Sequence, residues 1–384
     1  MVRREYWLDR VEDAWRRQSV LWLAGVRRAG KTFLCRSLDD IEYFDCELPG
    51  VRRSMEDPES FLDARRGRRL ILDEIHRLAN PSELLKIAAD HFPETRVIAT
   101  GSSTLGATAK FRDTLAGRRE TIWLTPMISP DLDDFGHKDL RHRFLHGGLP
   151  PFFLADRLPT HSFQDWVDAY WAKDIQELFR LERRWAFQRF VELLFAQSGG
   201  MFEATRFATP CEVSRQSISN YLAVLEETLV VRVVRPFSAR RSTEIVSAPK
   251  VYGFDTGFVC LYRGWNRLRD EDLGLLWEHY VLNELTGRLR ARGVRYWRNK
   301  HGAEVDFVFP RRGGAPIAIE CKWTADAFDA GAIAAFRRLH PGEPNLVVAP
   351  DVDIPFNRRH GEHTIEFVSL EQLVERLDVE PLAA

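Results

Sequence analysis

The sequence lacks the features that define several large classes of protein. No apolar run approaches the roughly 18 residues of a membrane-spanning helix, and the longest, around Val20–Val26, has the length of a strand. The N-terminal segment MVRREYWLDR has no apolar core of the kind that secretory signal peptides carry, so we expect a cytoplasmic protein without a membrane partner. The five cysteines form neither a CxxC pair nor a Cys/His spacing typical of zinc, which argues against a disulfide scaffold and a structural zinc site.

Lysine is also scarce, and neither sign of charge dominates. Of the 55 basic residues only eight are lysine and the others are arginine, while 56 acidic residues leave a net charge of −1. No global basic field therefore indicates a nucleic-acid partner. The hydrophobic and charged fractions of 45% and 29% are those of a globular protein, and 384 residues predict about two or three domains.

Apolar strands alternate with helical stretches in the first third of the chain. An amphipathic helix over residues 1–18 precedes a strand at 19–24, further strands are expected at 70–72 and 97–100, and this first unit is expected to close near residues 122–124. This alternation predicts an α/β fold with a mostly parallel sheet covered by helices.

A phosphate-binding motif follows the first strand. It matches G-x-x-x-x-G-K-[ST] and consists of Gly25, Val26, Arg27, Arg28, Ala29, Gly30, Lys31 and Thr32. The glycines let the backbone wrap a phosphate with its N–H groups pointing inward, and the following helix adds its positive N-terminal end. Lys31 can reach the β- and γ-phosphates, and the Thr32 hydroxyl can ligate Mg²⁺. The motif predicts an ATP·Mg²⁺ site, with a glycine-rich surface turn as the alternative.

The strand Leu70-Ile71-Leu72 delivers two acids, Asp73 and Glu74, at its C-terminal end. Asp73 can hold Mg²⁺ through water, and Glu74 can polarise the attacking water. Two solvated acids at a strand end are the alternative. Because the pair follows the phosphate-binding motif and precedes a further strand, we favour the catalytic interpretation.

Two further segments supply candidates for the same site. Ser102 and Ser103 follow the strand at 97–100 and are either a sensor beside the γ-phosphate or a helix cap. Arg118 and Arg119 are candidate arginine fingers, which a neighbouring subunit often supplies, or else a solvated pair.

The chain resembles a large group of bacterial and archaeal AAA-like ATPases in the order of five segments, GVRRAGKT, LILDEIH, TGSS, LAGRR and HGGLP. In that group, a C-terminal part long catalogued as a domain of unknown function looks like a winged helix followed by a restriction-endonuclease-like fold. The resemblance implies the nucleotide-site roles given above, with Arg118 rather than Arg119 as the finger, and a homo-oligomer in which that finger acts. The stretch TPMISPDLDDFG departs from the family's usual Pro-Leu-Ser-Phe-x-Glu-Phe, so it carries no expectation of subunit contacts.

A helix-turn-helix pattern occupies residues 203–225. Its second helix would bury Val213, Ile218, Tyr221, Leu222 and Leu225, and would expose Arg215, Gln216, Ser217 and Asn220. The exposed set suits phosphates and base edges, and the arginine-rich run 232–241 would form a wing. A protein-docking module or a spacer between domains is the alternative.

The last third places three acids and a lysine in the order of a metal-dependent nuclease of the restriction-endonuclease-like fold. Asp306 and Glu320 would hold Mg²⁺ or Mn²⁺, and Glu278 would support the metal or its water. Lys322 shares one strand face with Glu320 and would orient the nucleophile or stabilise charge. An ion pair on a solvent-facing strand is the alternative.

These patterns predict three domains: an AAA-type P-loop ATPase domain over 1–128, a helical and winged-helix-like domain over 129–250, and a restriction-endonuclease-like α/β domain over 251–384. We expect an ATPase that controls a DNA-directed, nuclease-like C-terminal module. The alternative is a nucleotide-gated signalling or defence regulator whose nuclease-like domain is inert and binds a protein partner. A stand-alone nuclease with a vestigial ATPase is a third interpretation.

Overall fold

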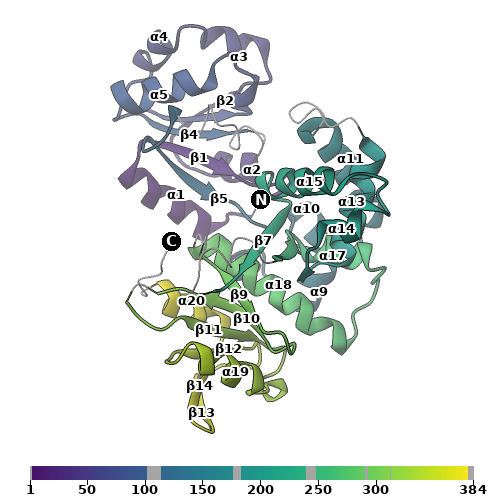
Figure 1. The fold of residues 1–384 in the computed structure, drawn as a ribbon. Helices are drawn as coiled ribbons and strands as arrows, with labels where there is room; N and C mark the ends of the chain where they lie inside the picture. Colours follow the sequence, from purple (N-terminus) through teal and green to yellow (C-terminus); the bar gives the residue numbers. More distant parts are fainter. Residues whose placement is uncertain are drawn as a thin grey trace. The chain divides into compact units, whose positions relative to one another are not determined.

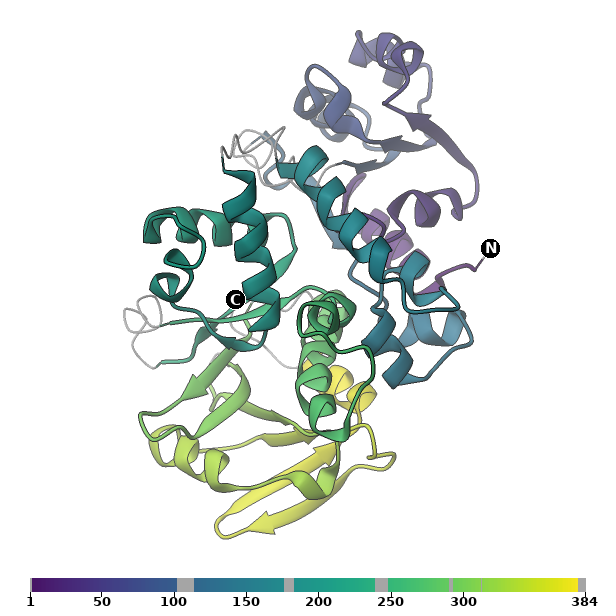
Figure 2. The same cartoon turned by 90° about the vertical axis from the view of Figure 1, so that its right-hand side faces the viewer.

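The computed structural model describes residues 2–101, 114–175, 183–238, 248–289, 293–311 and 313–378. The chain forms two compact units and passes between them several times (Figures 1 and 2). The first unit contains residues 1–139, 148–184 and 223–230, and the second contains 140–147, 185–222 and 231–384. The boundaries near residues 128 and 250 stay predictions.

The first unit is built on a parallel five-stranded sheet in the order β2-β3-β4-β1-β5. Its strands are β1 (Val20–Ala24), β2 (Ile41–Asp45), β3 (Arg69–Asp73), β4 (Arg96–Thr100) and β5 (Arg119–Trp123). All of β1 is buried, as expected for a strand covered on both faces. The register pairs Leu72 with Ala99 and Leu23 with Thr100, so β3, β4 and β1 end at the same edge.

The helices of this unit follow the strands. They are α1 (Glu5–Arg17), α2 (Lys31–Arg36), α3 (Pro49–Ser54), α4 (Pro58–Asp63), the 3₁₀ turn η1 (Ile75–Arg77), α5 (Pro81–His91), α8 (Ser129–Asp134), α10 (Pro150–Phe153), α11 (Thr160–Tyr170) and the π-helical turn η2 (Trp171–Ile175). The α1 helix contacts β1 and β5 through its buried apolar stripe, and α2 contacts β4. The expected first helix, the parallel sheet and its strands at 19–24, 70–72 and 97–100 are confirmed, whereas the half-buried edge strand β2 and the strand β5 had not been expected.

The second unit is built on a mixed nine-stranded sheet in the order β13-β14-β12-β11-β10-β9-β7-β8-β6. Its strands are β6 (Gly200–Met201), β7 (Val231–Pro236), β8 (Lys250–Gly253), β9 (Arg295–Arg298), β10 (Glu304–Phe309), β11 (Ile317–Cys321), β12 (Asn345–Val348), β13 (Phe356–His360) and β14 (His363–Val368). The β9–β10–β11 part is antiparallel, and β11, β12 and β14 run parallel.

The helices of this unit are α9 (Leu140–His146), α13 (Arg184–Ala196), α14 (Ala204–Ala208), α17 (Thr256–Tyr262), α18 (Asp270–Leu289), the 3₁₀ turn η3 (Ala325–Ala327), α19 (Gly331–Leu339) and α20 (Leu370–Asp378). The helix α15 (Arg215–Glu227) begins in this unit, and its residues after 222 belong to the first. Ile333 and Phe336 of α19 join a buried core with Trp297, Val347 and Phe367 from the strands. The long helix α18 contacts β11 and α20.

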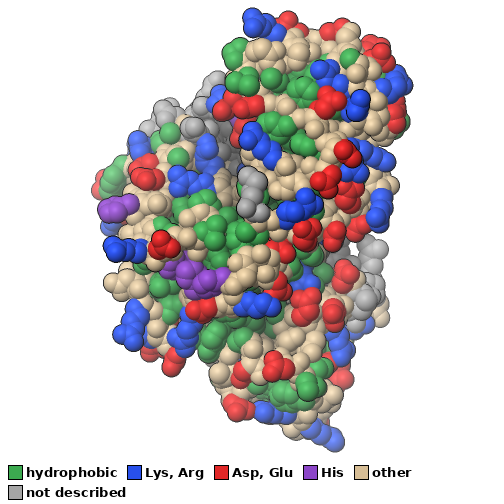
Figure 3. Space-filling view, turned by 180° about the vertical axis from the view of Figure 1, so that it is seen from behind, with side chains coloured by type: hydrophobic (Ala, Val, Ile, Leu, Met, Phe, Trp, Pro, Cys, Tyr) green, Lys and Arg blue, Asp and Glu red, His purple; other side chains and the backbone are tan. Residues whose placement is uncertain are grey.

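Charge is mixed over the surface, in keeping with the net charge of −1. On the face drawn in Figure 3, basic and acidic side chains lie interspersed. Within the described ranges, no helix combines the length and the apolar character needed to cross a membrane.

Candidate functional site

The phosphate-binding motif forms the connection from β1 to α2 in the first unit. Gly30 adopts φ +96°, a conformation that favours glycine, and α2 begins at the next residue. A Cβ at Gly25 would lie 2.5 Å from the Leu124 carbonyl oxygen, so the loop passes too close to the chain after β5 for any side chain. Both motif glycines are therefore required by the backbone itself.

Lys31 and Thr32 point toward the sheet edge. Lys31 Nζ donates to the carbonyl oxygens of Gly25 and Val26 at 2.8 and 3.2 Å, so the ammonium lies folded over the loop. Thr32 Oγ1 donates to Asp73 Oδ2 at 2.8 Å. A hydroxyl and a carboxylate side by side are oxygen ligands of the kind that Mg²⁺ prefers, so these residues fit the ion that the motif implies.

Asp73 ends β3 and is buried, with three hydroxyl donors around its carboxylate. Besides Thr32, Tyr43 donates to Oδ2 and Thr100 donates to Oδ1. Burial raises the pKa of Tyr43, and its hydrogen bond to the Asp73 carboxylate raises it further. Tyr43 therefore stays a neutral donor. Tyr43 on β2 was missed because no local pattern in the sequence indicated that strand.

Glu74 follows Asp73 with a left-handed backbone at φ 54° and ψ 43°, an uncommon conformation for a non-glycine residue. Its amide donates to Thr100 Oγ1 at 3.3 Å, and its Oε2 lies 3.2 Å from His76 Nδ1. The hydrogen bond from His76 lowers the pKa of Glu74, and the charges of Lys31 and Arg27 lower it further. Glu74 is thus an ionised carboxylate, suited to accept a proton.

A pocket of about 800 Å³ opens over these residues, within the size range of small-molecule sites. Arg27, Arg28, Lys31, Thr32 and Glu74 line its polar part. Its apolar part is lined by Phe135, Pro150, Pro151, Leu154 and Trp166. The pocket therefore joins a phosphate-binding half to a half that suits a flat, apolar ring.

Two side chains from outside the motif hold the carbonyl side of the loop. Trp166 Nε1 of α11 donates to the Arg27 carbonyl at 3.0 Å, and Arg4 donates to the Ala29 carbonyl at 2.9 Å. Arg4 is itself fixed by two 2.7 Å bonds to Asp131, and both side chains of this pair are buried. No local pattern indicated these residues, because each partner lies more than 100 positions away: 127 for Arg4 and Asp131, and 139 for Trp166 and Arg27.

Of the other residues predicted for the nucleotide site, the structure describes the two arginines but not the two serines. Ser102 and Ser103 lie outside the described residues. Arg118 precedes β5, and its Nε donates to Asp90 of α5 at 2.7 Å, with about a third of both side chains exposed. Arg119 places its guanidinium 5.9 Å from the ring centroid of Trp22. Both arginines are half-buried, so exposure does not distinguish between them.

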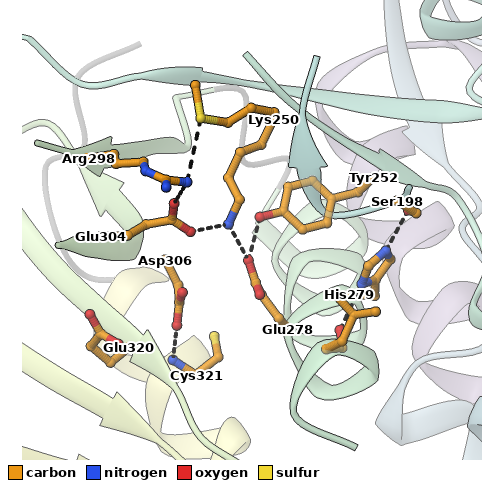
Figure 4. A network of polar contacts seen from close by, with 12 residues as sticks. Ser198, Lys250, Tyr252, Glu278, His279, Arg298, Glu304, Asp306, Glu320 and Cys321 are labelled. Atoms are coloured by element: carbon orange, nitrogen blue, oxygen red, sulfur yellow. Dashed lines mark hydrogen bonds and ion pairs between the residues drawn. The ribbon is translucent and has the colours of Figure 1, made fainter. Parts of the chain in front are cut away.

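In the second unit, the predicted nuclease residues Glu278, Asp306 and Glu320 lie in one region, which Figure 4 shows without Lys322. Lys322 Nζ lies 2.6 Å from Glu320 Oε2 and 3.7 Å from Asp306 Oδ2. Asp306 also accepts the Cys321 amide at 2.8 Å. Glu320 is buried with its Oε1 lacking a hydrogen-bond partner; burial raises its pKa to about 8, and the charge of Asp306 adds to this.

Glu278 has different neighbours. Lys250 Nζ of β8 donates to Glu278 Oε1 at 2.9 Å and to Glu304 Oε1 at 2.6 Å, and Tyr252 donates to the same Glu278 oxygen. Although burial lowers the pKa of Lys250, the negative charge of Glu278 and of nearby acids raises it above its usual value overall. Lys250, Tyr252 and Glu304 were missed by sequence reasoning; the scarcity of lysine was the one available signal.

A pocket of about 750 Å³ adjoins this region, lined by Glu304, Glu320, Lys322, His301 and Arg338 among others. Among the residues that the structure describes, no group of three or more His, Cys, Asp or Glu side chains is placed to hold a metal ion. The carboxylates instead lie against lysines. They therefore do not fit the metal that the nuclease pattern implies.

The helix-turn-helix pattern corresponds to α14, a turn and α15. Ile218, Tyr221, Leu222 and Leu225 are buried as predicted, and Val213 is half-buried. The predicted outward set is exposed except for the half-buried Ser217, whose amide and Oγ bond Ser214 Oγ at the helix start. The following strand β7 pairs with β8 and β9, and residues 239–247 of the expected wing are not described.

Three family models match successive parts of the chain. Residues 17–131 match an AAA domain, residues 137–269 match a domain of unknown function (DUF8612), and residues 273–370 match a domain of unknown function (DUF4143). Uncharacterized proteins of Mycobacterium tuberculosis and Mycobacterium bovis are each 28% identical over 326 residues, which covers 82% of this chain and 73% of each relative.

Solved structures show more distant similarity. A Walker-type ATPase of Pyrococcus abyssi is 16% identical, with a TM-score of 0.44 over 68% of this chain and 96% of that one. A signal transduction ATPase with numerous domains from Pyrococcus horikoshii is 12% identical, with a TM-score of 0.28 over 76% of this chain and 46% of that one. By its family matches, the chain carries an AAA-type P-loop domain at its N-terminus and a DUF4143 domain at its C-terminus.

Proposed function

We propose that the protein binds ATP·Mg²⁺ through residues 25–32 and hydrolyses the nucleotide with Glu74 as the base. The observation that carries this proposal is the meeting of Lys31, Thr32, Asp73 and Glu74 at one edge of a parallel sheet, beside a pocket of about 800 Å³. Carboxyl ends of parallel strands are where such sheets bind ligands. The apolar half of the pocket offers a surface for the adenine ring.

Each side chain has a separate task in the proposed reaction. Lys31 leaves the carbonyls of Gly25 and Val26 and places its ammonium on the β- and γ-phosphates. Thr32 and Asp73 hold Mg²⁺, which shields phosphate charge when bound. Glu74 is ionised at neutral pH because His76 and nearby cations lower its pKa, so it accepts a proton from the attacking water.

Two substitutions test the proposal together. Lys31→Ala should abolish nucleotide binding in calorimetry, and Glu74→Gln should keep binding while phosphate release falls by about a hundredfold or more. Glu56→Gln, at an exposed surface position, is the matched control and should behave as the unmodified protein. Unchanged hydrolysis by Glu74→Gln would refute the role given to this residue.

The proposed ATPase controls the second unit, and α15 is the element through which it does so. This single helix starts at Arg215 in the second unit and ends at Glu227 in the first. Its first turns expose Arg215, Gln216 and Asn220, which suit phosphates and base edges. Salt-dependent binding to duplex DNA that weakens in Arg215→Ala would support a DNA-directed module, whereas unchanged binding would remove α15 from that role.

The nuclease-like region of the second unit has two candidate functions, metal-dependent cleavage and a non-catalytic scaffold that binds a partner. The pairing of Lys322 with Glu320 and Asp306 favours the scaffold, because each of these carboxylates already contacts a cation. Incubation with duplex and single-stranded DNA and RNA, with Mg²⁺ or Mn²⁺ and with or without ATP, separates the two. Cleavage that disappears in Asp306→Ala would establish the nuclease and refute the scaffold.

A further inference from the structure

The acids of the nuclease-like region in the second unit form ion pairs with two different lysines. Lys322 forms ion pairs with Glu320 and Asp306, as described above. Lys250 forms hydrogen-bonded ion pairs with Glu278 of α18 and with Glu304 at the start of β10. Figure 4 shows the Lys250 side chain reaching between these two carboxylates, with Tyr252 beside it. The cluster around Lys250 is absent from the nuclease pattern, which places Glu278 with Asp306 and Glu320.

Lys250 is buried among acidic and aromatic side chains. Only 5% of its side chain is exposed, compared with 13% for Glu278 and 23% for Glu304. The rings of Tyr252 and Tyr296 have their centroids 5.5 and 5.8 Å from Nζ, within reach of a cation–π attraction. The ammonium thus has two carboxylate partners and two aromatic neighbours.

One Glu278 oxygen and both Glu304 oxygens of this cluster already have protein partners. Glu278 Oε1 accepts from both Lys250 and Tyr252, Glu304 Oε1 accepts from Lys250, and Glu304 Oε2 lies 3.3 Å from Arg298 NH1. A divalent cation of the Mg²⁺ type needs several free oxygen ligands at short range. A buried ammonium and a metal ion would compete for the same carboxylate oxygens, and repel each other across them.

We propose that Lys250 is the built-in cation of this cluster: its ammonium occupies the position between Glu278 and Glu304 that a divalent metal would otherwise take, so the native chain holds no metal there. The cluster then works as a fixed electrostatic joint between β8, α18 and β10. This inference goes beyond the proposed ATPase, since it holds whether or not Glu74 hydrolyses ATP.

Removal of the ammonium tests the proposal. We expect Lys250→Met, which keeps the length of the side chain without its charge, to acquire one Mn²⁺ site with affinity at least about tenfold above the native protein. Lys250→Arg keeps the charge and should acquire none. Adding Glu278→Gln to Lys250→Met should abolish the new site.

Binding is measured by electron paramagnetic resonance of free Mn²⁺ on the full chain, without nucleotide and in a Thr32→Ala background that weakens the site in the first unit. Failure of the ATPase proposal therefore leaves this result unaffected. The native chain alone can overturn the inference: one Mn²⁺ bound in the Thr32→Ala protein, and lost in Glu278→Gln, would show that a metal and not Lys250 holds the cluster. Circular dichroism shows whether Lys250→Met is folded. If it is misfolded, the Mn²⁺ titrations of the native protein and of Glu278→Gln decide whether a metal or Lys250 holds the cluster.

Discussion

At the scale of single residues, the nucleotide site depends on the environment of one glutamate. Glu74 has a strained left-handed backbone, which aims it away from the line of β3 and toward the pocket. His76 lies two residues further, and its ring nitrogen holds one carboxylate oxygen at 3.2 Å. Because this hydrogen bond is the main reason for the lowered pKa of Glu74, the histidine acts on the base as a positioning residue.

Removal of His76 should therefore change the pH profile as well as the rate. We expect His76→Ala to lower ATP turnover by up to about tenfold at neutral pH. The pKa of Glu74 would rise without its donor, so the acid limb of the profile should move to higher pH. Steady-state phosphate release from pH 5 to 8 measures both effects. A lower rate with an unmoved acid limb would mean that His76 supports the fold rather than the ionisation of Glu74.

At the scale of elements, the helix α11 holds the phosphate-binding loop through one of the loop's backbone carbonyls. The Trp166 indole donates to the Arg27 carbonyl, and the same ring stacks on Tyr170 at 5.3 Å. Tyr170 in turn bonds the hydroxyl of Thr228, just after α15. Three side chains of the first unit thus connect the loop to the end of α15, the helix through which we propose that the ATPase controls the second unit.

Trp166→Phe should weaken this support while the aromatic ring stays in place. Loss of one hydrogen bond of ordinary strength predicts about two- to tenfold weaker ATP binding. Isothermal titration measures it, and Trp185→Phe, at a tryptophan that is 57% exposed, is the matched control. Equal affinities for the two variants would contradict a role of the indole N–H in shaping the loop.

The helix α18 carries a buried histidine whose protonation state is fixed by its partners. His279 Nδ1 donates to the Leu275 carbonyl at 2.8 Å, so Nε2 accepts from Ser198 Oγ at 2.6 Å and the ring is neutral. Burial lowers the pKa of His279 from 6.5 to about 4, and the charges of Arg263 and Lys250 add to this. Between those two pH values the unfolded chain binds a proton that the folded chain does not bind, so folding stability falls as the pH falls.

This lowered pKa predicts a loss of about 2 kcal/mol in the free energy of unfolding between pH 7 and pH 5 from His279 alone. His279→Gln should be less stable at pH 7 but should lose this component of the pH dependence. Urea denaturation at both pH values, compared between the two proteins, measures the difference. An identical loss of stability between pH 7 and pH 5 in the two proteins would show that folding does not change the pKa of His279.

The sequence predicted the elements whose signals are contiguous and missed those that depend on distant partners. The motif at residues 25–32, the acids after β3 and the buried positions of α15 were predictable because each follows from a local pattern. The sequence did not predict the roles of Arg4, Trp166 and Lys250, because their partners lie 25 or more residues away and no local pattern indicates them. Asp306 and Glu320 were placed correctly near each other, but the lysine that holds Glu278 altered the chemistry expected of the group.

At the scale of the whole molecule, Arg118 is the residue that we expect to act on the nucleotide of a neighbouring subunit. It lies at the start of β5, and its partner in the same chain is Asp90, in a pair that is partly exposed to solvent. Because solvent screens such a pair, the guanidinium can exchange Asp90 for a phosphate oxygen of a neighbouring subunit. The homo-oligomer that the family resemblance implies would therefore need no rearrangement of buried groups around Arg118.

A mixing experiment tests this arrangement. Arg118→Ala should lower ATP turnover by about a hundredfold or more with little change in ATP affinity, because a finger acts on the transition state. Arg118→Ala and Glu74→Gln are each inactive alone, yet in a mixed assembly the intact Glu74 of the first variant meets the intact Arg118 of the second. Phosphate release should therefore reappear on mixing and depend on protein concentration. If Arg118 acts within its own chain, or only through Asp90, the mixture stays as inactive as its parts, and Asp90→Ala reproduces the loss.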